Sequence, residues 1–565
     1  MDLGKPSTKR MMDGETALKI AALAICALVL LRHAWICDDA FITFRTARNL
    51  ILGEGLRWNL HERVQGFTHP LWALLLIPVY ALAKEPMGAA FALSLAASMA
   101  TLYLVAFRLR LPTPCALLVV AILISSKSFV DYSSSGLENP LTHLLLVLLV
   151  AEHVAALDRG TQGADRVVAS RRTALRATLL SGLLALNRLD AVLFALPFLL
   201  SAYAGLRDSV RGAARILLLG FLPFLIWEIF AVVYYGFPFP NTAYAKLASG
   251  VPRAALWLQG AHYYLSQADF DPISVVAMAF ALLLVALRRD RYAFVLGAGL
   301  LLYLIYVTGI GGDFMAGRFF SAPTLVAALA IGLLLRGPVA STGRVAYLPA
   351  LTTLGLGLCL TAHPTLGSST DYPLAVNPVS KNYWDERGVC DERAYYAPSS
   401  GLMRSSRTSV MPNDWRTARG LSVPENGVVS LAQVGVAGFF APPTAIIVDG
   451  YGLNDAFVAR LPTADKVSWR IGHFVRALPT GYMETLQYRR NVIADPKLAQ
   501  LYDRIQVVVS GPIWAWERWK EVLRLNLGMS PPPLPPAPPV KRRLIPTIRP
   551  APPAAKKPGQ GVPNR

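Results

Sequence analysis

Long apolar runs separated by short basic loops extend to about residue 362 of this 565-residue chain. Several runs approach the length of about 20 apolar residues that a helix needs to cross a bilayer, and they lack the polar face of a soluble helix. The pattern predicts a polytopic α-helical membrane protein with about eleven transmembrane helices. We expect the spans at roughly 17–36, 87–107, 113–126, 138–156, 175–189, 191–206, 214–235, 272–287, 292–309, 323–335 and 345–362.

Basic residues set the expected orientation. Lys5, Lys9, Arg10 and Lys19 precede the first run, which predicts a cytoplasmic N-terminus and a retained signal anchor. The other basic loops fall on the same side only if the short, proline-containing run 71–83 does not cross. We therefore expect that run to be re-entrant or interfacial. The C-terminal part is then expected on the far face of the membrane, which is the periplasmic face if this is the inner (cytoplasmic) membrane of a bacterium.

The composition changes after the last apolar run. The pattern divides the chain into a transmembrane domain (1–362), a polar extracytoplasmic domain (363–528) and a proline-rich basic tail (529–565). The middle segment contains short strand-like runs such as GVVSLAQV and TAIIVDGYG. The tail has the composition of an extended, disordered segment.

The net charge of +20, from 55 Lys and Arg against 35 Asp and Glu, would suit a nucleic-acid-binding protein. Basic residues of cytoplasmic loops and of the tail explain this charge, and no nucleic-acid motif accompanies it. We therefore expect membrane lipid around the chain and no nucleic acid. The five cysteines form no CxxC pair or His/Cys cluster, which argues against a zinc site or a disulfide framework.

Unusual polar stretches gather on one predicted face of the membrane. They are DDAFITFRTARNL, GEGLRWNLHERVQGFTHPLW, DYSSSGLENPLTH, LNRLD, YYGFPFPNTAYAK and GGDFMAGRFFSAP. Polar residues kept only for packing would not all sort to the same side. A transporter would place its charges near the middle of the membrane and show repeated halves, which this chain does not.

The adjacent carboxylates Asp38 and Asp39 directly follow the first span. Such a pair is often simply solvated. Here it begins an amphipathic pattern with Phe41, Phe44 and Arg45, which predicts a helix lying in the interface and holding the carboxylates at the mouth of the bundle. We interpret the pair as catalytic or substrate-binding.

Two of the other stretches place charges near helix ends. Glu138 begins a span, where a carboxylate also stabilises the helix dipole without further function. Arg188 and Asp190 lie at the turn of a tight helix hairpin, where an internal ion pair is the structural alternative.

The remaining stretches contribute Lys246, Asp313, Arg318 and His69. Lys246 follows PNTAYA, and the alternative for it is a lysine that snorkels to the interface. Asp313 and Arg318 follow two glycines that permit a sharp turn and aim both charges inward. His69 is either a general base or a structural hydrogen-bond donor.

Transfer of a sugar from a lipid-linked phosphate fits these residue types. The lipid tail of such a donor lies in the bilayer and its phosphate lies at the interface, where Arg and Lys can bind it. A carboxylate can take the proton from an acceptor hydroxyl, and another can stabilise a developing oxocarbenium charge.

The same stretches resemble membrane glycosyltransferases of the GT-C class, in particular the mycobacterial terminal arabinofuranosyltransferases and the related pilin arabinofuranosyltransferases. The matching segments are Asp38–Arg45, Gly55–Trp72, Ser135–Glu138, Arg188–Asp190, Tyr234–Lys246, Gly311–Phe320 and VDGYGLNDAFVAR at 448–460. Gln65, Asn139 and Asn187 depart from that pattern, and Gln65 removes a carboxylate. The resemblance implies a GT-C helical bundle with an extracytoplasmic α/β or β-rich domain.

The resemblance also implies a polyprenyl-phosphoryl arabinofuranose donor and a glycan or protein acceptor. It leaves a divalent cation open. By position it makes Asp38 or Asp39 the base. It implies donor binding by Arg45, Arg188, Lys246 and Arg318, a pocket of His69, Glu138, Asp190, Asn241 and Asp313, and acceptor binding by Asp449 and Asp455. For the last two, holding a turn is the structural alternative.

Three other functions remain open at this stage. A GT-C transferase with another polyprenyl-linked sugar would use the same charges. A transporter or lipid flippase and a non-enzymatic envelope scaffold fit the sequence less well.

Overall fold

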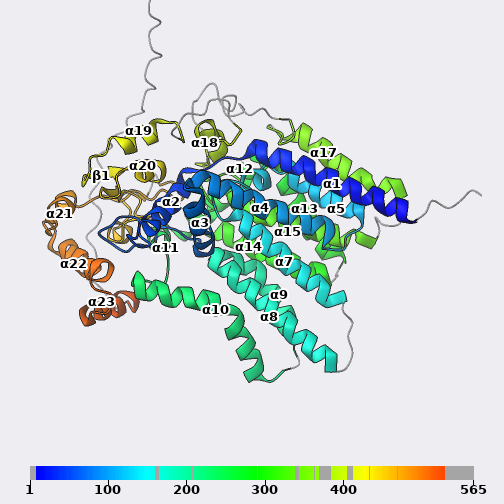
Figure 1. The fold of residues 1–565 in the computed structure, drawn as a ribbon, viewed down its shortest axis with the longest axis horizontal. Helices are drawn as coiled ribbons and strands as arrows, with labels where there is room; N and C mark the ends of the chain where they lie inside the picture. The colour runs from blue at the N-terminus through cyan, green and yellow to red at the C-terminus, as the bar shows by residue number, and fades with distance from the viewer. Residues whose placement is uncertain are drawn as a thin grey trace, which may run out of the picture.

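The computed structural model describes residues 8–158, 164–204, 206, 208–247, 249–288, 291–337, 343–361, 363–367, 384–403, 411–431, 433–466 and 469–528. The predicted tail 529–565 lies outside these ranges. Helices make up most of the described structure, and the bundle that they form is flanked at one end by the C-terminal elements (Figure 1).

In the described part of the chain, four helices are long and apolar enough to cross a membrane. They are α1 (Thr8–His33), α4 (Pro86–Phe107), α7 (Asn139–Asp158) and α10 (Val210–Tyr234). The helices α12 (Arg253–Phe270) and α13 (Pro272–Arg288) would form a fifth, broken span, because they bend by 115° at the break between them. The chain is therefore a helical membrane protein, whereas the predicted number of eleven spans is not confirmed.

Several predicted spans correspond to apolar helices that are too short to cross a bilayer alone. These are α5 (Thr113–Ser125), α9 (Val192–Ala204), α14 (Arg291–Gly309), α15 (Ser321–Leu334) and α17 (Leu348–Leu360), and α3 (Pro70–Ala83) is the run expected to be re-entrant. A 14-residue helix such as α15 extends about 21 Å, less than the hydrocarbon thickness of about 30 Å. The remaining bundle helix, α8 (Ala164–Asn187), begins with a basic segment.

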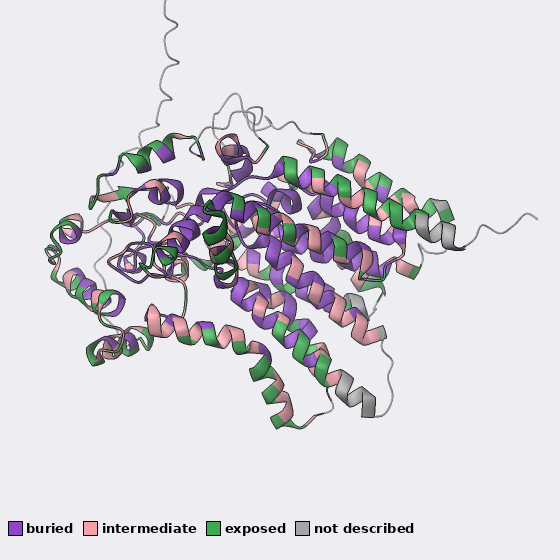
Figure 2. Ribbon diagram, in the orientation of Figure 1, coloured by how far each residue is buried: buried purple, intermediate pink, exposed green. Residues whose placement is uncertain are grey.

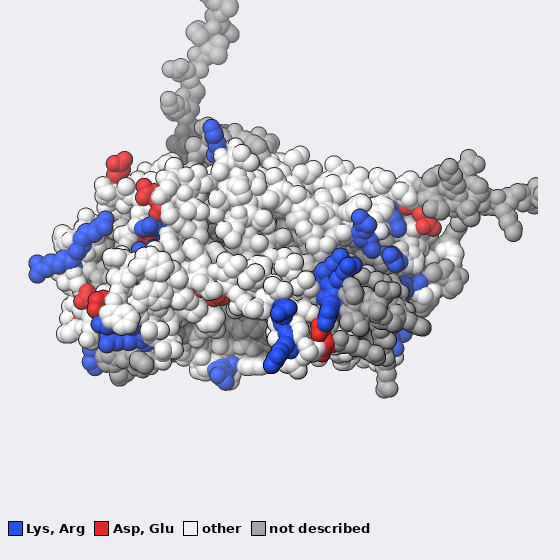
Figure 3. Space-filling view, turned by 60° about the horizontal axis from the view of Figure 1, so that its bottom comes forward, with Lys and Arg blue, Asp and Glu red and all other residues white. Residues whose placement is uncertain are grey.

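The centre of the bundle is α15, all of whose residues are buried. It packs against α5, α13 and α14. Buried residues line the interior of the bundle, while α1, α10 and α17 carry exposed apolar faces (Figure 2). Figure 3 shows charged side chains towards the two ends of one face and few charges in the broad stretch between them, as suits a surface in contact with lipid.

The C-terminal part contains both helices and strands. The two predicted strand-like runs form β1 (Val428–Leu431) and β2 (Ile446–Asp449), which pair in parallel with Val428 opposite Ile446. Around them lie α18 (Glu392–Ser400), α19 (Trp415–Leu421), α20 (Gly435–Phe440), α21 (Tyr482–Tyr488), α22 (Pro496–Ser510) and α23 (Trp516–Asn526).

Short elements connect these parts. They are α2 (Asp38–Ile51), α6 (Lys127–Asp131), α11 (Asn241–Leu247) and the 3-10 turns η1 (Leu189–Ala191), η2 (Arg318–Phe320), η3 (Gly343–Tyr347) and η5 (Val458–Arg460). The helix predicted after the first span is present as α2, but it does not lie on the surface. Ten of its 14 residues are buried, because α3 packs on one side and α20 on the other.

Candidate active site

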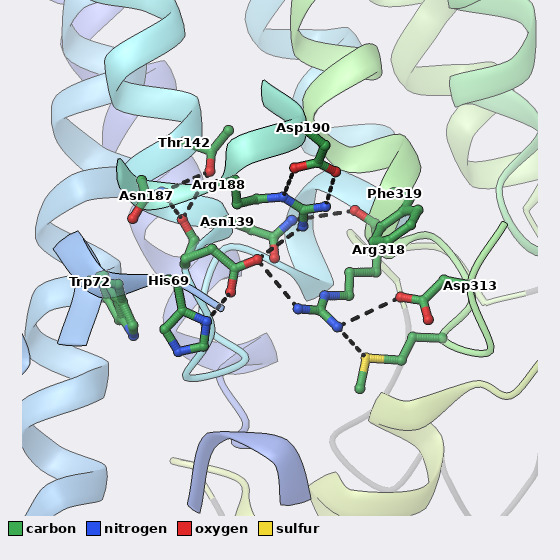
Figure 4. Close-up of polar contacts among 12 residues, drawn as sticks. His69, Trp72, Asn139, Thr142, Asn187, Arg188, Asp190, Asp313, Arg318 and Phe319 are labelled. Carbon is green, nitrogen blue, oxygen red and sulfur yellow. Dashed lines mark hydrogen bonds and ion pairs between the residues drawn. The ribbon is translucent and has the colours of Figure 1, made fainter. Parts of the chain in front are cut away.

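Glu138 is the centre of an ion-pair cluster at one end of the bundle, and α7 begins one residue after it. Its Oε1 accepts a hydrogen bond from Arg188 Nη1 at 2.9 Å and another from Arg318 Nη2 at 3.3 Å. Its Oε2 lies 3.1 Å from His69 Nδ1. Figure 4 shows these groups converging from different elements. The predicted residues His69, Glu138, Arg188 and Arg318 therefore form one cluster.

The Arg188 side chain is held on two sides. Its Nε and Nη2 donate to the two carboxylate oxygens of Asp190 at 2.9 and 2.5 Å, and Tyr303 Oη donates to Asp190 Oδ2 at 3.1 Å. Arg188 thus forms the internal ion pair that was the structural alternative, and it reaches Glu138 as well. Its strong pairing leaves little freedom to follow a substrate.

Arg318 is less tightly paired. Its Nη1 lies 3.7 Å from Asp313 Oδ2, and its Nε is buried without a hydrogen-bond partner in the described structure. The turn that presents Asp313 depends on Gly311 and Gly312, which have positive φ angles of 87° and 71°. A Cβ on Gly312 would lie 2.4 Å from the Tyr263 ring, so only glycine fits there.

His69 is positioned between two partners. Its Nε2 is 2.9 Å from Thr43 Oγ1, while its Nδ1 is at ion-pair distance from Glu138. The Nδ1 contact is an ion-pair distance without hydrogen-bond geometry, so Nε2 is the ring nitrogen with a hydrogen-bond partner in the described structure. The arrangement is compatible with both roles considered for His69.

Asp38 and Asp39 have different surroundings although they are neighbours in the sequence. The two Asp38 oxygens accept backbone hydrogen bonds from Gly435 (3.0 Å) and Val436 (2.9 Å), the first residues of α20. Asp38 is buried, and burial raises its pKa to about 6. Asp38 therefore ties α2 to the C-terminal part of the chain.

The Asp39 carboxylate is partly exposed and makes no hydrogen bond or ion pair with any described residue. Burial raises the pKa of this carboxyl, while the nearby cations Arg318 and Lys246 oppose the rise and the Asp313 carboxylate adds to it. A carboxylate with a raised pKa and free lone pairs beside cationic groups has the properties of a general base.

Arg45 and Asn241, predicted to contact the donor and to line the pocket, bind backbone in this structure. Arg45 is fully buried and donates to the carbonyls of Trp58 and Ala445, both at 3.0 Å. The Asn241 amide donates to the carbonyls of Gly452 (2.7 Å) and Asp455 (3.0 Å). Both side chains hold C-terminal loops against the bundle.

The predicted acceptor residues Asp449 and Asp455 are buried. Asp449 accepts from the backbone N–H groups of Tyr451 (2.9 Å) and Leu453 (2.9 Å), and Asp455 accepts from the Tyr482 hydroxyl at 2.6 Å. These contacts favour the alternative in which the two carboxylates hold the turns after β2.

Asn139 and Asn187, which depart from the family pattern, form hydrogen bonds to the backbone of the cluster residues Arg318 and Glu138. Asn139 Nδ2 donates to Ser321 Oγ at 2.8 Å and to the Arg318 carbonyl at 3.3 Å. Asn187 Nδ2 donates to Thr142 Oγ1 at 2.9 Å and to the Glu138 carbonyl at 3.2 Å. From the sequence, both residues were noted only as departures from the family pattern. Their positions inside two of the motifs could have indicated that they contact the site residues beside them.

The described residues contain no group of three or more His, Cys, Asp or Glu side chains arranged to hold a metal ion. Glu138, Asp190 and Asp313 instead form ion pairs with arginines, whereas Asp39 has no ion-pair partner among the described residues.

No protein-family model matches the chain. Among solved structures, ArnT of Cupriavidus metallidurans bound to undecaprenyl phosphate has a TM-score of 0.45 at 13% identity and covers 77% of this chain and 86% of that chain. The apo oligosaccharyltransferase of Archaeoglobus fulgidus has a TM-score of 0.47 at 14% identity and covers 89% of this chain and 72% of that chain. Both are distant likenesses.

Two curated proteins are similar in sequence. A terminal β-(1→2)-arabinofuranosyltransferase of Mycobacterium tuberculosis is 29% identical over 415 residues, which cover 66% of this chain and 63% of that relative. One of the same name from Corynebacterium glutamicum is 28% identical over 344 residues, which cover 53% of this chain and 48% of that relative. The chain thus spans about half to two thirds of the length of these relatives. The resemblance predicted from the motifs is confirmed: by sequence, this chain is a relative of the terminal arabinofuranosyltransferases.

Proposed function

We propose that this chain is a membrane glycosyltransferase of the GT-C class that moves a sugar from a polyprenyl-phosphate donor to a glycan or protein acceptor outside the cytoplasm. The observation that carries the proposal is the Asp39 carboxylate, which has no hydrogen-bond or ion-pair partner among the described residues and lies near Arg318 and Lys246. The names of the sequence relatives support arabinofuranose as the sugar.

In the proposed reaction, Asp39 takes the proton of an acceptor hydroxyl while the hydroxyl oxygen bonds to the anomeric carbon of the donor. The bond from that carbon to the phosphate oxygen breaks, and its electron pair leaves with the polyprenyl phosphate. Arg318 and Lys246 stabilise the charge that develops on this phosphate. Arg188 and Glu138 hold Arg318 in place, because Glu138 bridges the two arginines.

We further propose that the reaction occurs on the outer face of a bacterial cytoplasmic membrane. The lipid tail of the donor would lie along the apolar helices, and its phosphate would reach the cluster at their ends. The expected multi-pass topology, with a cytoplasmic N-terminus, gives this arrangement.

The test is incubation of the purified protein with synthetic polyprenyl-phosphoryl arabinofuranose and candidate glycan or protein acceptors, with products identified by mass spectrometry. We expect transfer of one pentose. Preference for a hexose donor would replace the sugar assignment, and lipid movement in proteoliposomes without any glycosylated product would favour the transporter.

A further inference from the structure

The helix α23 is fixed to the end of α10. Arg518, which is fully buried, donates from Nη2 to the Tyr234 carbonyl at 3.1 Å. Asn526 Nδ2 donates to the Gly236 carbonyl at 2.8 Å. Val522 is buried on the same side, and a Cβ on Gly236 would lie 3.3 Å from its Cγ2 atom. Residues from the first and last turns of α23 therefore contact the segment in which α10 ends.

The end of α10 marks the boundary of the membrane near α23. α10 has the highest mean hydropathy of the four candidate spans, 2.5. The Tyr235 hydroxyl, just after α10, donates at 3.0 Å to the carbonyl of Leu56, in the loop after α2. The end of α10 therefore lies at the same end of the bundle as Asp39, and Figure 1 shows α23 beside it. A spanning helix ends where the hydrocarbon layer ends, so contact with this end places α23 at the level of the lipid headgroups.

The side of α23 away from these contacts is exposed and apolar. Trp516, Leu523 and Leu527 follow one another at intervals of seven and four residues, which place them on one face of a helix. These three residues and Trp514, just before α23, are 52–78% exposed, and we call them the apolar face of α23. Lys520 lies on the same side, with its ammonium 5.7 Å from the centre of the Trp516 ring. Such neighbouring large apolar side chains on a surface mark a contact with a membrane or a partner.

Three observations favour lipid as the partner of the apolar face. Two of its four side chains are tryptophans, which are enriched where a membrane meets water because the ring is apolar and its N–H is polar. Phe239, in the loop that follows α10, is half exposed and adds apolar surface near the same boundary. The sequence after α23 contains lysine and arginine but no aspartate or glutamate, a charge that anionic lipids attract.

We propose that α23 is a membrane anchor whose apolar face inserts into the lipid boundary on the Asp39 side, while Lys520 reaches the lipid phosphates. α23 then lies along the membrane surface and ties the C-terminal part of the chain to the lipid, in addition to the contacts of that part with the bundle. The anchor goes beyond the proposed transfer reaction and does not depend on it.

Fluorescence quenching by spin-labelled lipids tests the insertion on the intact chain. The parent carries Cys359→Ser, which removes the exposed native cysteine, and Leu523→Cys is labelled with a small maleimide fluorophore. The protein is reconstituted into vesicles of phosphatidylethanolamine and phosphatidylglycerol. An interfacial helix inserts only about 5–10 Å. We therefore expect a quencher attached just below the headgroup to lower the fluorescence at residue 523 more than a quencher at the end of the acyl chain.

Two control positions define the scale. Glu517→Cys lies on the exposed polar edge of α23, where the label should lose less fluorescence with either lipid. Ile226→Cys lies on the exposed side of α10, about 12 Å from its end, and the deep quencher should act more strongly there. Quenching at residue 523 that does not exceed that at residue 517, or that is stronger with the deep quencher, would overturn the anchor. Energy transfer between labels at residue 523 of two copies, without quenching by lipid, would overturn it in favour of a dimer.

A label at residue 527 tests whether the apolar side chains drive the insertion. Trp516→Ser combined with Leu523→Ser should reduce the quenching of labelled Leu527→Cys by the shallow lipid, because burial of apolar area supplies the binding free energy. The matched control is Glu517→Ser combined with Arg524→Ser, two exposed positions on the polar edge, which should leave the quenching unchanged. Equal quenching in the two double variants would show that protein contacts alone hold α23 at the membrane, and would overturn the anchor.

Discussion

Asp38 and Asp39 show how much a single position along α2 matters. Asp38 binds two backbone N–H groups of α20, whereas Asp39 has no hydrogen-bond partner in the described structure and lies near Arg318 and Lys246. Asp39→Asn should reduce turnover by about 10²–10⁴-fold, as expected for loss of a general base, with little effect on folding. Asp38→Asn should mainly lower the unfolding temperature, because an amide nitrogen cannot accept one of the two N–H groups.

Turnover and thermal unfolding measured on both variants separate the two roles. The assignment would be reversed if Asp38→Asn were stable and inactive while Asp39→Asn kept the wild-type rate.

Asp449 makes stability depend on pH. Burial raises its pKa from 3.8 to about 7, against the opposing hydrogen bonds from the Tyr451, Asn454 and Leu453 N–H groups. The folded protein therefore retains a proton that the unfolded chain loses, so the contribution of Asp449 to stability is complete below about pH 4 and declines as the pH rises towards 7. Unfolding temperatures between these values should fall more steeply for wild type than for Asp449→Asn. Parallel curves would show that Asp449 ionises in the folded protein at its ordinary pKa.

At the scale of elements, the contact between α2 and α20 is very close. A Cβ on Gly435 would lie 1.9 Å from the Asp38 carbonyl oxygen, and this atom belongs to the backbone, which cannot turn away. Overpacking typically lowers the free energy of unfolding by about 2 kcal/mol. We expect Gly435→Ala to lower it by at least this amount. The matched control is Gly450→Ala, where an added Cβ meets nothing within 4 Å. Equal denaturant midpoints for the two variants would show that α2 and α20 can separate without cost.

Glu138, Arg188, Asp313 and Arg318 could be selected from the sequence because charged residues at the ends of apolar helices stand out. The structure brings these four side chains into one ion-pair cluster. Glu392, buried at the start of α18, escaped notice because its surrounding segment is polar, so nothing local distinguishes it. The backbone contacts of Cys390 with Phe314 and Ala316, which place this segment beside the Asp313 loop, join positions far apart in the sequence.

The roles of Arg45 and Asn241 could not be predicted from the sequence either. Each occurs inside a recognisable motif, yet each binds carbonyl groups of C-terminal loops hundreds of residues away. A sequence pattern reports which residue types occur together along the chain, but the partner of a buried side chain is fixed by the packing of distant segments. The same limit explains why α2 was expected at the membrane surface: nothing in residues 38–51 reveals that α20 covers them.

At the scale of the whole molecule, the two ends of the bundle can be told apart. Lys19, in the first half of α1, lies 5.5 Å from the ring of Phe107 at the end of α4, and Thr113 at the start of α5 donates to Glu15 at 2.5 Å. Asp38 and Asp39 follow the opposite end of α1. This arrangement supports the interpretation that the run 71–83 does not cross, because α4 then returns to the end where α1 begins.

The arrangement predicts which side of the membrane each end occupies. Glu425 and Arg108 are both exposed, and they lie on the Asp39 side and on the opposite side, respectively. In a parent with Cys359→Ser, which removes the exposed native cysteine, Glu425→Cys should react with a membrane-impermeant maleimide in intact cells. Arg108→Cys should react only after permeabilisation, because the positive-inside rule predicts that the basic loops lie in the cytoplasm. The reverse pattern would place Asp39 and the arginine cluster in the cytoplasm, and the acceptor would then be a cytoplasmic molecule.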